Sequence, residues 1–590
     1  MQLDAITGLD QASLAETRRI LHDMKERLDA IVAEDRLTQA AFVELAAIYD
    51  NAAYVFLYLE SNEQHVDYRA LLPYRTAFFK NDVLDGRLRA LCAQLNCEDP
   101  ELEECRRAYV AHLDGKLTAD PGRAEELEKL QEHVKEIARA GDRDQLALLG
   151  RLGLDISSGS ARSIAYSVIS ATGDASRRAK LAGAMTTLRD KRLGALLETT
   201  DRMVAVRRED SRHRGFATPL DETMRRCSLS VEAARGLVDD YLVGAIEEHR
   251  ALEAEIREVV GEVAAPMDHF GHYLRKLQGD LPVPLFDLQD CLGFVRRVAE
   301  RVFGLTMSQL PDNGSQVLTV VVSRGEQVVG YINFDLWDAG RNRAANSTSG
   351  IRNRVDWGDI VQLPIAYVSC RFHRQPDGRD RITFQNVHSL FHETGHALNH
   401  LLVSKRLPTV SGLDYLPLER IEDLSMWHER WVYHPDFVDH LDLSADERAG
   451  MEFCQRAKIL EYQRTHVERA VTAALDFGVH GAEEGGLRAE FDRLDERFDI
   501  SRYCSLGDYP VYFSWPMINA NPGASFVYTR SAAASAEAFA PVLGRRLDDL
   551  DPAEFEGRFA ACFDYDLPSG TPDIRSIFTS YRDLLGKPIS

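Results

Sequence analysis

The sequence predicts a mostly α-helical protein with one small β-sheet. Helical periodicity fills residues 9 to about 150, where glycines are few, and it resumes from 161 to about 279 and again from 444 to the end. Between 316 and 385 the sequence pattern changes to short runs of β-branched and aromatic residues bounded by Gly, Asn and Asp. This change of pattern separates a predicted sheet from the helices on either side.

The first half of the chain is predicted to contain two helical regions. The segment Leu154–Ser160 interrupts the helical pattern with Ser and Gly, which are typical of chain breaks. We therefore expect an N-terminal helical region over 1–155 and a second over 156–300. The second includes the charge-rich run Ser230–Val263, and such helices most simply form the walls of a bundle.

The predicted sheet is built from three runs, and a polar segment interrupts it. The runs are Gln316–Val322, Val328–Phe334 and Ile365–Ser369. The segment Asp338–Asn353 is rich in Asn and Gly, so we expect a loop there. Its place before the next helix makes it a candidate rim for a cleft.

The helix after the sheet carries the most informative motif, His392-Glu393-Thr394-Gly395-His396. Histidines four positions apart on a helix leave the same face one turn apart, close enough to bind one metal ion. Glu393, next to the first histidine, can take a proton from a water whose pKa the metal lowers. Chance would produce this pattern about 0.04 times in a chain of this composition. The alternative is an amphipathic helix with two surface histidines.

A catalytic zinc of this type needs a third protein ligand, which in one broad class is a carboxylate on a second helix. The segment Pro417–Trp431 suits that helix, with Pro417 near its first turn and apolar residues at helical spacing. Spacing alone does not choose among Glu419, Glu422 and Glu429.

The flanking residues resemble a known family. Phe391–Leu398, followed by Arg420–Ser425 and Glu429–Trp431, is similar to the thimet oligopeptidase and oligoendopeptidase F family of zinc metallopeptidases, gluzincins with a downstream Glu ligand. Further similar stretches occur in the same order at Phe303–Leu305, Gly330–Leu336, Pro364–Cys370 and Leu475–His480. Weaker similarity, at Arg207-Arg208 and Arg214-Gly215-Phe216, extends the resemblance over about two thirds of the chain.

The resemblance implies a site and a shape. It places the third ligand on Glu422, so that His392, His396 and Glu422 bind one zinc ion per chain with Glu393 as the general base; similar ligand sets also accept Mn²⁺ or Co²⁺. The catalytic region is then 301–590. The implied fold is a mostly α, two-lobed ellipsoid with a deep central channel that admits short unfolded peptides.

Two further carboxylates lie on the predicted ligand helix. Asp423 and Glu429 could orient the ligating histidines. Exposed carboxylates on the helix face are the simpler expectation for both.

The sequence departs from the family near the motif and in the segment 513–530. Thr394 stands where the family usually has Phe, and Leu424 and Met426 replace Pro and Gln. Farther on, the family carries a His, a Gly-Gly-Tyr and a Tyr-Tyr-x-Tyr cluster that donate hydrogen bonds to the substrate and the developing oxyanion.

An ungapped alignment from Trp515 keeps only Tyr528 of that cluster. It places Met517, Gly523 and Arg530 at the other positions, although an insertion before Glu537 could shift the register. Losing one oxyanion donor costs about a hundredfold or more in rate. Our candidate substrate or oxyanion residues are therefore Tyr528, Arg530 and Tyr512. The alternative for Tyr528 and Tyr512 is a packed core aromatic, and the alternative for Arg530 is a surface or ion-paired arginine.

Composition fits a cytosolic globular enzyme. The 70 basic and 93 acidic residues give a formal charge of −23, which argues against nucleic acid or an anionic membrane as the main partner. The nine cysteines are scattered without a C-x-x-C pair, as expected of reduced thiols. Residues 1–23 lack an apolar signal core, and no run of eighteen or more apolar residues occurs.

The leading hypothesis is a cytoplasmic zinc-dependent oligopeptidase that hydrolyses short unfolded peptides. One alternative is a zinc hydrolase of the same fold dedicated to one small peptide or peptide-like biosynthetic intermediate. Another is a peptide-binding homologue that has lost catalysis, although the retained base Glu393 argues against it. The sequence leaves the substrate sequence and the oligomeric state open.

Overall fold

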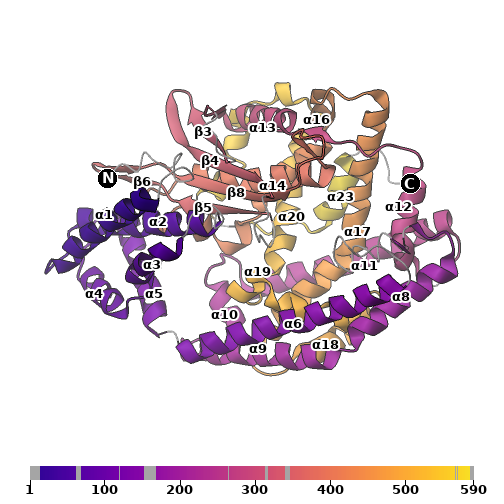
Figure 1. The fold of residues 1–590 in the computed structure, drawn as a ribbon, viewed down its shortest axis with the longest axis horizontal. Coiled ribbons are helices and arrows are strands. Elements are labelled where there is room, and N and C mark those ends of the chain that lie inside the picture. The colour runs from indigo at the N-terminus through magenta and orange to yellow at the C-terminus, as the bar shows by residue number, and fades with distance from the viewer. Residues whose placement is uncertain are drawn as a thin grey trace. The chain divides into compact units, whose positions relative to one another are not determined.

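A computed structural model describes most of the chain (Figure 1). The described residues are 14–61, 68–118, 120–151, 168–169, 171–263, 265–311, 317–338, 346–564, 567 and 569–584. The predicted break at Leu154–Ser160 and the boundary at 155/156 lie outside them. The prediction of a mostly α chain with small sheets is confirmed, whereas the three predicted domain ranges and the central channel stay predictions.

The chain divides into two compact units that each combine distant segments. Unit 1 comprises Met1–Ala119, Leu285–Asp442 and Pro541–Pro568, and unit 2 comprises Asp120–Pro284, Leu443–Ala540 and Ser569–Ser590. The candidate metal motif belongs to unit 1.

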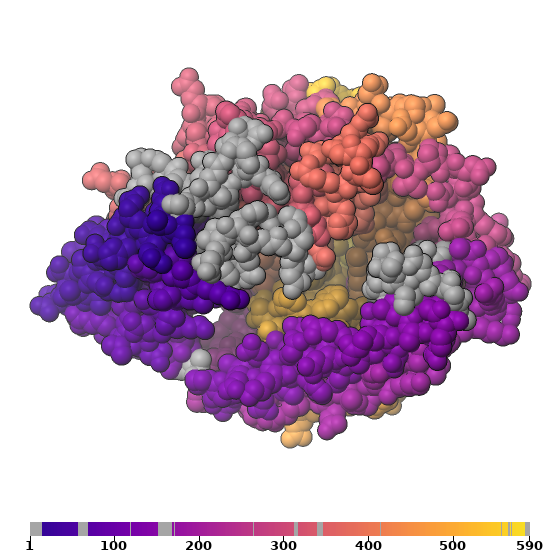
Figure 2. Space-filling view, in the orientation of Figure 1, coloured from indigo at the N-terminus to yellow at the C-terminus, as the bar shows by residue number. Residues whose placement is uncertain are grey.

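Among its described residues, unit 2 contains helices and no strand. Its helices are α6 Pro121–Arg151, α8 Ala175–Asp190, α9 Leu193–His213, α10 Pro219–Met224, α11 Val231–Val260, η3 Pro266–His269, α12 Phe270–Gln278, α17 Ala445–Gly481, α18 Leu487–Phe498, η8 Ile500–Arg502, η9 Leu506–Asp508, η10 Pro510–Ser514, α19 Pro516–Ala520, α20 Phe526–Phe539 and α23 Arg575–Leu584. The long helices α11 and α17 pack along each other. Helix α6 packs on α9, and α6 forms part of the visible surface of this unit (Figure 2).

Local sequence explains where the two long helices begin. Ser444 and Glu447 form a capping box before α17, and the Ser230 side chain accepts from the Ala233 amide before α11. Gly261, at φ 99°, ends α11. The predicted helix over Ser230–Val263 is therefore confirmed to within a few residues.

Unit 1 surrounds the main sheet with helices. They are α1 Leu14–Ala33, α2 Gln39–Ser61, η2 Tyr68–Leu71, α3 Leu72–Phe79, α4 Asp82–Ala93, α5 Pro100–Thr118, α13 Leu288–Phe303, α14 Phe384–Leu402, η4 Pro408–Val410, η5 Leu413–Tyr415, η6 Leu418–Arg420, α15 Asp423–Glu429, η7 Arg430–Tyr433, α16 Pro435–His440, η12 Leu547–Asp549, α21 Pro552–Glu556 and α22 Ala560–Phe563. A further 3-10 turn, η11 Ala540–Val542, includes the point in the sequence where unit 2 ends at Ala540 and unit 1 resumes at Pro541.

The main sheet has five strands in the order β2-β3-β4-β8-β5. Their bounds are β2 Thr306–Gln309, β3 Leu318–Arg324, β4 Gln327–Trp337, β5 Ser347–Arg352 and β8 Ile365–Phe372. Among the described pairs of this sheet, β4 and β8 run parallel and the other neighbours run antiparallel. Two further pairs join β1 Phe286–Asp287 to β9 Arg381–Ile382, and β6 Val355–Trp357 to β7 Ile360–Gln362. The three predicted strand runs correspond to β3, β4 and β8.

The loop predicted over Asp338–Asn353 is wrong in its second half. Residues 347–352 form β5, which pairs with β8 so that Thr348 faces Val368 and Gly350 faces Ala366. Ser-Thr-Ser-Gly-Ile-Arg offers no alternation of apolar residues, so pairing with β8 creates this strand where local pattern does not. The part of the predicted loop over 339–345 lies outside the described residues.

Helix α14 packs against β4, β5 and β8, so the motif helix is supported by the sheet (Figure 1). Helix α15 packs on α14. Among the helices that the structure describes, we find none with the length and hydropathy of a membrane span.

Candidate metal and catalytic site

Helix α14 presents the whole motif from one rigid element. The Thr383 side chain caps its first turn by accepting from the Asn386 amide. Apolar side chains along it are buried, namely Phe384, Val387, Leu390, Phe391, Ala397, Leu398 and Leu401. The predicted helix is confirmed, and it fixes the spacing of His392 and His396.

Two imidazoles and one carboxylate converge beside α14. The Nε2 atoms of His392 and His396 lie 3.3 Å and 3.1 Å from one oxygen of Glu422, Oε2. The side chains of His396 and Glu422 are each only 10% exposed. Glu419, the first alternative ligand on this segment, is buried but is not part of the cluster.

The cluster fits a tetrahedral divalent ion. Zinc bonds of about 2.0–2.1 Å at tetrahedral angles place neighbouring ligand atoms about 3.3 Å apart, close to the separations between Glu422 and each histidine. All three ligand atoms lie within 4.8 Å of one another. A nitrogen, nitrogen and oxygen donor set is one that zinc accepts.

Glu429 lies behind His392 and contacts its ring. Its Oε2 is 3.0 Å from Nδ1 of His392 and 3.7 Å from Nε2 of His388. Because a carboxylate only accepts, Nδ1 of His392 carries the proton, and Nε2 is left to face Glu422. Glu429 is 7% exposed, so the expectation of an exposed carboxylate is wrong for it.

Neighbouring histidines keep the carboxylates of Glu422 and Glu429 charged. Burial would raise the pKa of Glu429, but the surrounding charges of His388 and His392 lower that pKa to about 2. Burial likewise opposes the charged form of Glu422, yet His396 and His392 hold its pKa well below the usual range. The pKa of His392 is raised well above its usual range, because hydrogen bonds to Glu422 and Glu429 outweigh the lowering effect of burial.

Glu393 is held by the strand that the sequence does not predict. The Thr348 hydroxyl on β5 lies 2.8 Å from Oε2 of Glu393 and 2.9 Å from its backbone carbonyl, and can donate to either oxygen. Glu393 itself is 6% exposed. Its carboxylate is therefore positioned by both α14 and the edge of the sheet.

The continuous helix predicted over Pro417–Trp431 is wrong in detail. The segment forms η6, then α15, then η7, and Glu422 is the N-cap of α15 with φ −102° and ψ 0°. Because Glu422 lies outside the helical conformation, its carboxylate can reach back to accept a hydrogen bond of 2.7 Å from the Ser425 hydroxyl. Asp423, at the first position of α15, is half-buried.

Gly395 determines how closely α15 approaches α14. A Cβ built there would lie 2.6 Å from Cα of Ser425 and 2.7 Å from the carbonyl oxygen of Leu424. Nearby, the His428 Nδ1 donates to the Phe391 carbonyl at 2.8 Å, and burial lowers the pKa of His428 to about 4. Close packing at Gly395 thus places Glu422 within reach of both histidines.

The departures beside the motif fit their surroundings. Thr394 is fully buried and donates its hydroxyl to the Leu390 carbonyl at 2.7 Å, so its polar group is satisfied within α14. Leu424 is fully buried. Neither side chain supplies an atom to the cluster.

The candidate substrate residues Tyr512, Tyr528 and Arg530 all belong to unit 2. Tyr528 is 42% exposed, which differs from a packed core aromatic. Arg530 is buried, and its Nη2 donates to the Gly570 carbonyl at 3.4 Å. Tyr512 donates its hydroxyl to Glu468. Their roles toward a substrate stay predictions.

Gly523 is required by its backbone. It has φ 88°, and a Cβ there would lie 2.6 Å from Leu220. Its amide donates to Oδ1 of Asp476, which also accepts from Nδ1 of His480. A tyrosine at this position would not fit this turn.

Sequence reasoning missed Thr348, Ser425 and His388 as neighbours of the site. Thr348 lies in a polar segment without strand periodicity. Ser425 is indicated only by its place in the family motif. His388 precedes His392 by one turn, a spacing that also fits many amphipathic helices.

Comparison with known proteins finds a similar family. Residues 246–506, which include the whole cluster, match the model of peptidase family M3. This region of the chain is similar to peptidase family M3. The resemblance to the thimet oligopeptidase and oligoendopeptidase F family is thereby confirmed.

Relatives agree with this assignment. Oligopeptidase A of Salmonella typhimurium is 22% identical over 245 residues, covering 40% of this chain and 36% of that protein. Oligopeptidase A of Escherichia coli is 26% identical over 161 residues, covering 26% of this chain and 23% of that protein. The matched segments thus span about a third of the first relative and about a quarter of the second.

A crystal structure assigned to oligoendopeptidase F from Bacillus anthracis has a similar fold. It aligns with a TM-score of 0.53 and 12% identity, covering 98% of this chain and 92% of that chain. At this identity the likeness concerns the fold alone.

Proposed function

We propose that this chain is a metallopeptidase that hydrolyses short unfolded peptides, with one divalent ion, zinc in the first place, bound by His392, His396 and Glu422. The observation that carries the proposal is the convergence of two Nε2 atoms on one Glu422 oxygen at 3.1–3.3 Å, on the helix that also carries Glu393. The match of residues 246–506 to the model of peptidase family M3 supports the reaction class.

The bound ion would supply Lewis acidity, lowering the pKa of water and polarising a carbonyl. Glu393 then acts as the general base: its carboxylate accepts a proton from the attacking water and later gives it to the leaving amine nitrogen. Thr348 limits the motion of that carboxylate, and Glu429 holds His392 in the tautomer whose Nε2 is free to bind. Both contacts order the site before substrate arrives.

Replacing the base tests this assignment. We expect Glu393→Gln to lose a factor of about 10²–10⁴ in peptide hydrolysis while it keeps one metal ion per chain. The assay is cleavage of a panel of unstructured peptides, measured by mass spectrometry, beside elemental analysis of the same samples. Glu452→Gln, an exposed glutamate on α17, is the matched control and should retain full activity.

The assignment fails if Glu393→Gln keeps both metal and wild-type activity. It also fails if metal-replete wild-type protein cleaves no peptide of the panel. Cleavage of a folded protein at the rate of its own unfolded peptides would contradict the restriction to unfolded substrates.

A further inference from the structure

Strand β5 stands last in the order of the main sheet and is paired there with β8. Its sequence, Ser347–Arg352, contains Ile351 as its one aliphatic side chain, so burial of apolar side chains contributes little to holding it. Its position therefore depends on contacts with other elements. Because Thr348 on this strand contacts Glu393, those contacts also affect the candidate base.

The buried side chain of His400 joins α14 to the end of β5. It lies one turn after His396 and is 2% exposed. Its Nε2 is 2.8 Å from the carbonyl oxygen of Arg352, the last residue of β5, and its Nδ1 is 3.1 Å from the amide nitrogen of Leu413. Burial lowers the pKa of His400 to about 4, so the ring is neutral at neutral pH. Since an amide N–H only donates, Nδ1 accepts from Leu413, and Nε2 carries the proton and donates to Arg352.

Two glycines let the His400 ring approach the backbone. A Cβ built on Gly350 of β5 would overlap Nδ1 and Cε1 of the ring. On the side of η5, Gly412 has φ 87°, and a Cβ there would lie 2.9 Å from Cε1 of the ring. A larger residue at Gly350 would push the strand away from α14. The position of the ring and the position of the strand are therefore coupled.

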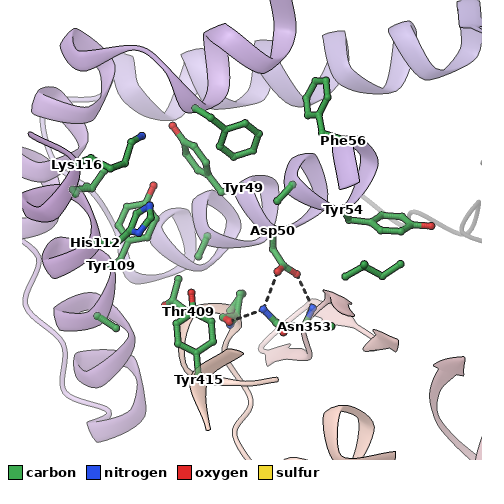
Figure 3. Close-up of a pocket in the computed structure, with 18 of the residues that line it drawn as sticks. Tyr49, Asp50, Tyr54, Phe56, Tyr109, His112, Lys116, Asn353, Thr409 and Tyr415 are labelled. Carbon is green, nitrogen blue, oxygen red and sulfur yellow. Dashed lines mark hydrogen bonds between the residues drawn. The ribbon is translucent and has the colours of Figure 1, made fainter. Parts of the chain in front are cut away.

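Helix α2 holds the residue that follows β5. The Asp50 carboxylate accepts from the backbone amide of Asn353 at 2.8 Å and from its side-chain amide at 2.9 Å (Figure 3). The Asn353 side chain also donates to the Pro408 carbonyl at 3.0 Å. These bonds fix the chain after β5 to α2, whereas the His400 bond fixes β5 itself to the helix that carries Glu393.

Strand β5 thus contacts α14 at two points. Thr348 meets Glu393, and four residues farther along the strand Arg352 meets His400. Four residues of strand span about 13 Å, and the seven residues from Glu393 to His400 span about 10 Å of helix. The two spans are similar, so β5 runs along α14, and a shift of the strand at His400 would carry Thr348 with it.

We propose that His400 is a positioning residue for peptide hydrolysis: it fixes β5 to α14 so that Thr348 holds the carboxylate of Glu393. The catalytic part of this inference rests on the proposed function, whereas the attachment of β5 to α14 is measurable without catalysis. Because His400 acts through Thr348, its contribution to kcat does not exceed that of the Thr348 hydroxyl.

Two substitutions at His400 separate its two bonds. His400→Gln keeps an N–H donor near the position of Nε2 and still reaches Arg352, whereas His400→Asn keeps a polar atom near Nδ1 and loses the bond to β5. We expect His400→Asn to lower kcat about tenfold, the factor expected for loss of the Thr348 hydroxyl. Its metal content should be full and its KM within about twofold of wild type. His400→Gln should keep kcat within about threefold of wild type.

A double-mutant cycle tests whether His400 acts through Thr348. The kcat of Thr348→Val/His400→Asn should equal that of Thr348→Val alone, because the hydroxyl that His400 positions is already absent. A role in stability alone would instead multiply the two effects to about a hundredfold or lower the metal content. Either of those results, or a wild-type kcat in His400→Asn, overturns the proposal.

Hydrogen exchange, followed by mass spectrometry, tests the attachment without catalysis. The amide hydrogens of residues 347–352 should exchange at least about tenfold faster in His400→Asn than in wild type, and His400→Gln should match the wild type. Unchanged exchange in His400→Asn overturns the proposal whether or not the chain cleaves peptides. Faster exchange in a chain that cleaves no peptide would refute the proposed function, and with it the catalytic role of His400, while confirming the attachment of β5.

Gly350→Ala perturbs the same contact from the strand, so the test does not depend on the folding of His400→Asn. Its Cβ would overlap the His400 ring, so we expect the same loss of kcat and the same faster exchange; wild-type values of both would overturn the proposal. His466→Asn is the matched control, since His466 is also buried and neutral but bonds Tyr241 in unit 2. It should lower stability and leave kcat and the exchange of residues 347–352 unchanged.

Discussion

The substitution Gly395→Ala should move α15 away from α14. The added Cβ would lie 2.6 Å from Cα of Ser425, about 0.8 Å short of the 3.4 Å at which ordinary contact begins. It would also lie 2.7 Å from the Leu424 carbonyl oxygen. Both atoms are backbone, so no side-chain rotation relieves the clash and α15 must move.

The magnitude follows from the tolerance of metal geometry. Metal–ligand distances vary by only about 0.2 Å in well-formed sites, so a shift approaching 0.8 Å takes Glu422 out of bonding range of an ion held by the histidines. We expect metal affinity to fall at least a hundredfold, with an overpacking cost of about 1–3 kcal/mol in the free energy of unfolding.

The assay is competition with a chelator of known affinity, combined with thermal unfolding of the metal-free protein. Gly236→Ala, on the exposed face of α11 with open space around its Cβ, is the control and should be neutral or stabilising by about 0.5–1 kcal/mol. If Gly395→Ala binds metal as tightly as the wild type, close packing of α15 does not position Glu422, and the geometric reasoning is refuted.

Three further outcomes follow from contacts around the site and from buried histidines. Thr348→Val should lower kcat about tenfold with full metal content, because Glu393 loses a hydrogen bond. Thr348→Ser, which keeps the hydroxyl, should restore kcat. A lowered metal content in Thr348→Val would contradict a positioning role. Glu429→Gln should weaken metal binding about 10- to 100-fold through the loss of the carboxylate on His392, and unchanged affinity in chelator competition would exclude that role. Burial lowers the pKa of His466 to about 3 and of His400 to about 4. The unfolded chain therefore binds protons below about pH 6.5 that the folded chain does not, and each histidine should cost about 2 kcal/mol of stability at pH 5 relative to pH 7.5. Urea unfolding midpoints that do not fall between these two pH values would contradict this.

The parts of the site that sequence could predict are those set by a single helix. The four-residue spacing of His392 and His396 fixes their common face whatever surrounds α14. The choice of Glu422 over its two neighbouring glutamates depends on a helix break and on close approach at Gly395. The spacing of residues predicts neither the helix break nor the close approach. Only the family resemblance favours Glu422.

Other features depend on contacts between distant segments. Glu429 is buried because α15 packs on α14, although its local sequence resembles an exposed helix face. Thr348 reaches Glu393 because β8 pairs with a strand that has no apolar alternation. The long helices and the strands β3, β4 and β8 were predictable because their apolar periods are strong.

The central claim is that His392, His396 and Glu422 hold one divalent ion. Its most direct test is calorimetric titration of zinc into metal-stripped protein, comparing wild type with Glu422→Ala. We predict one ion per wild-type chain and at least a hundredfold weaker binding in the variant. Stoichiometric zinc of equal affinity in both proteins, or no stoichiometric zinc in the wild type, would contradict the claim.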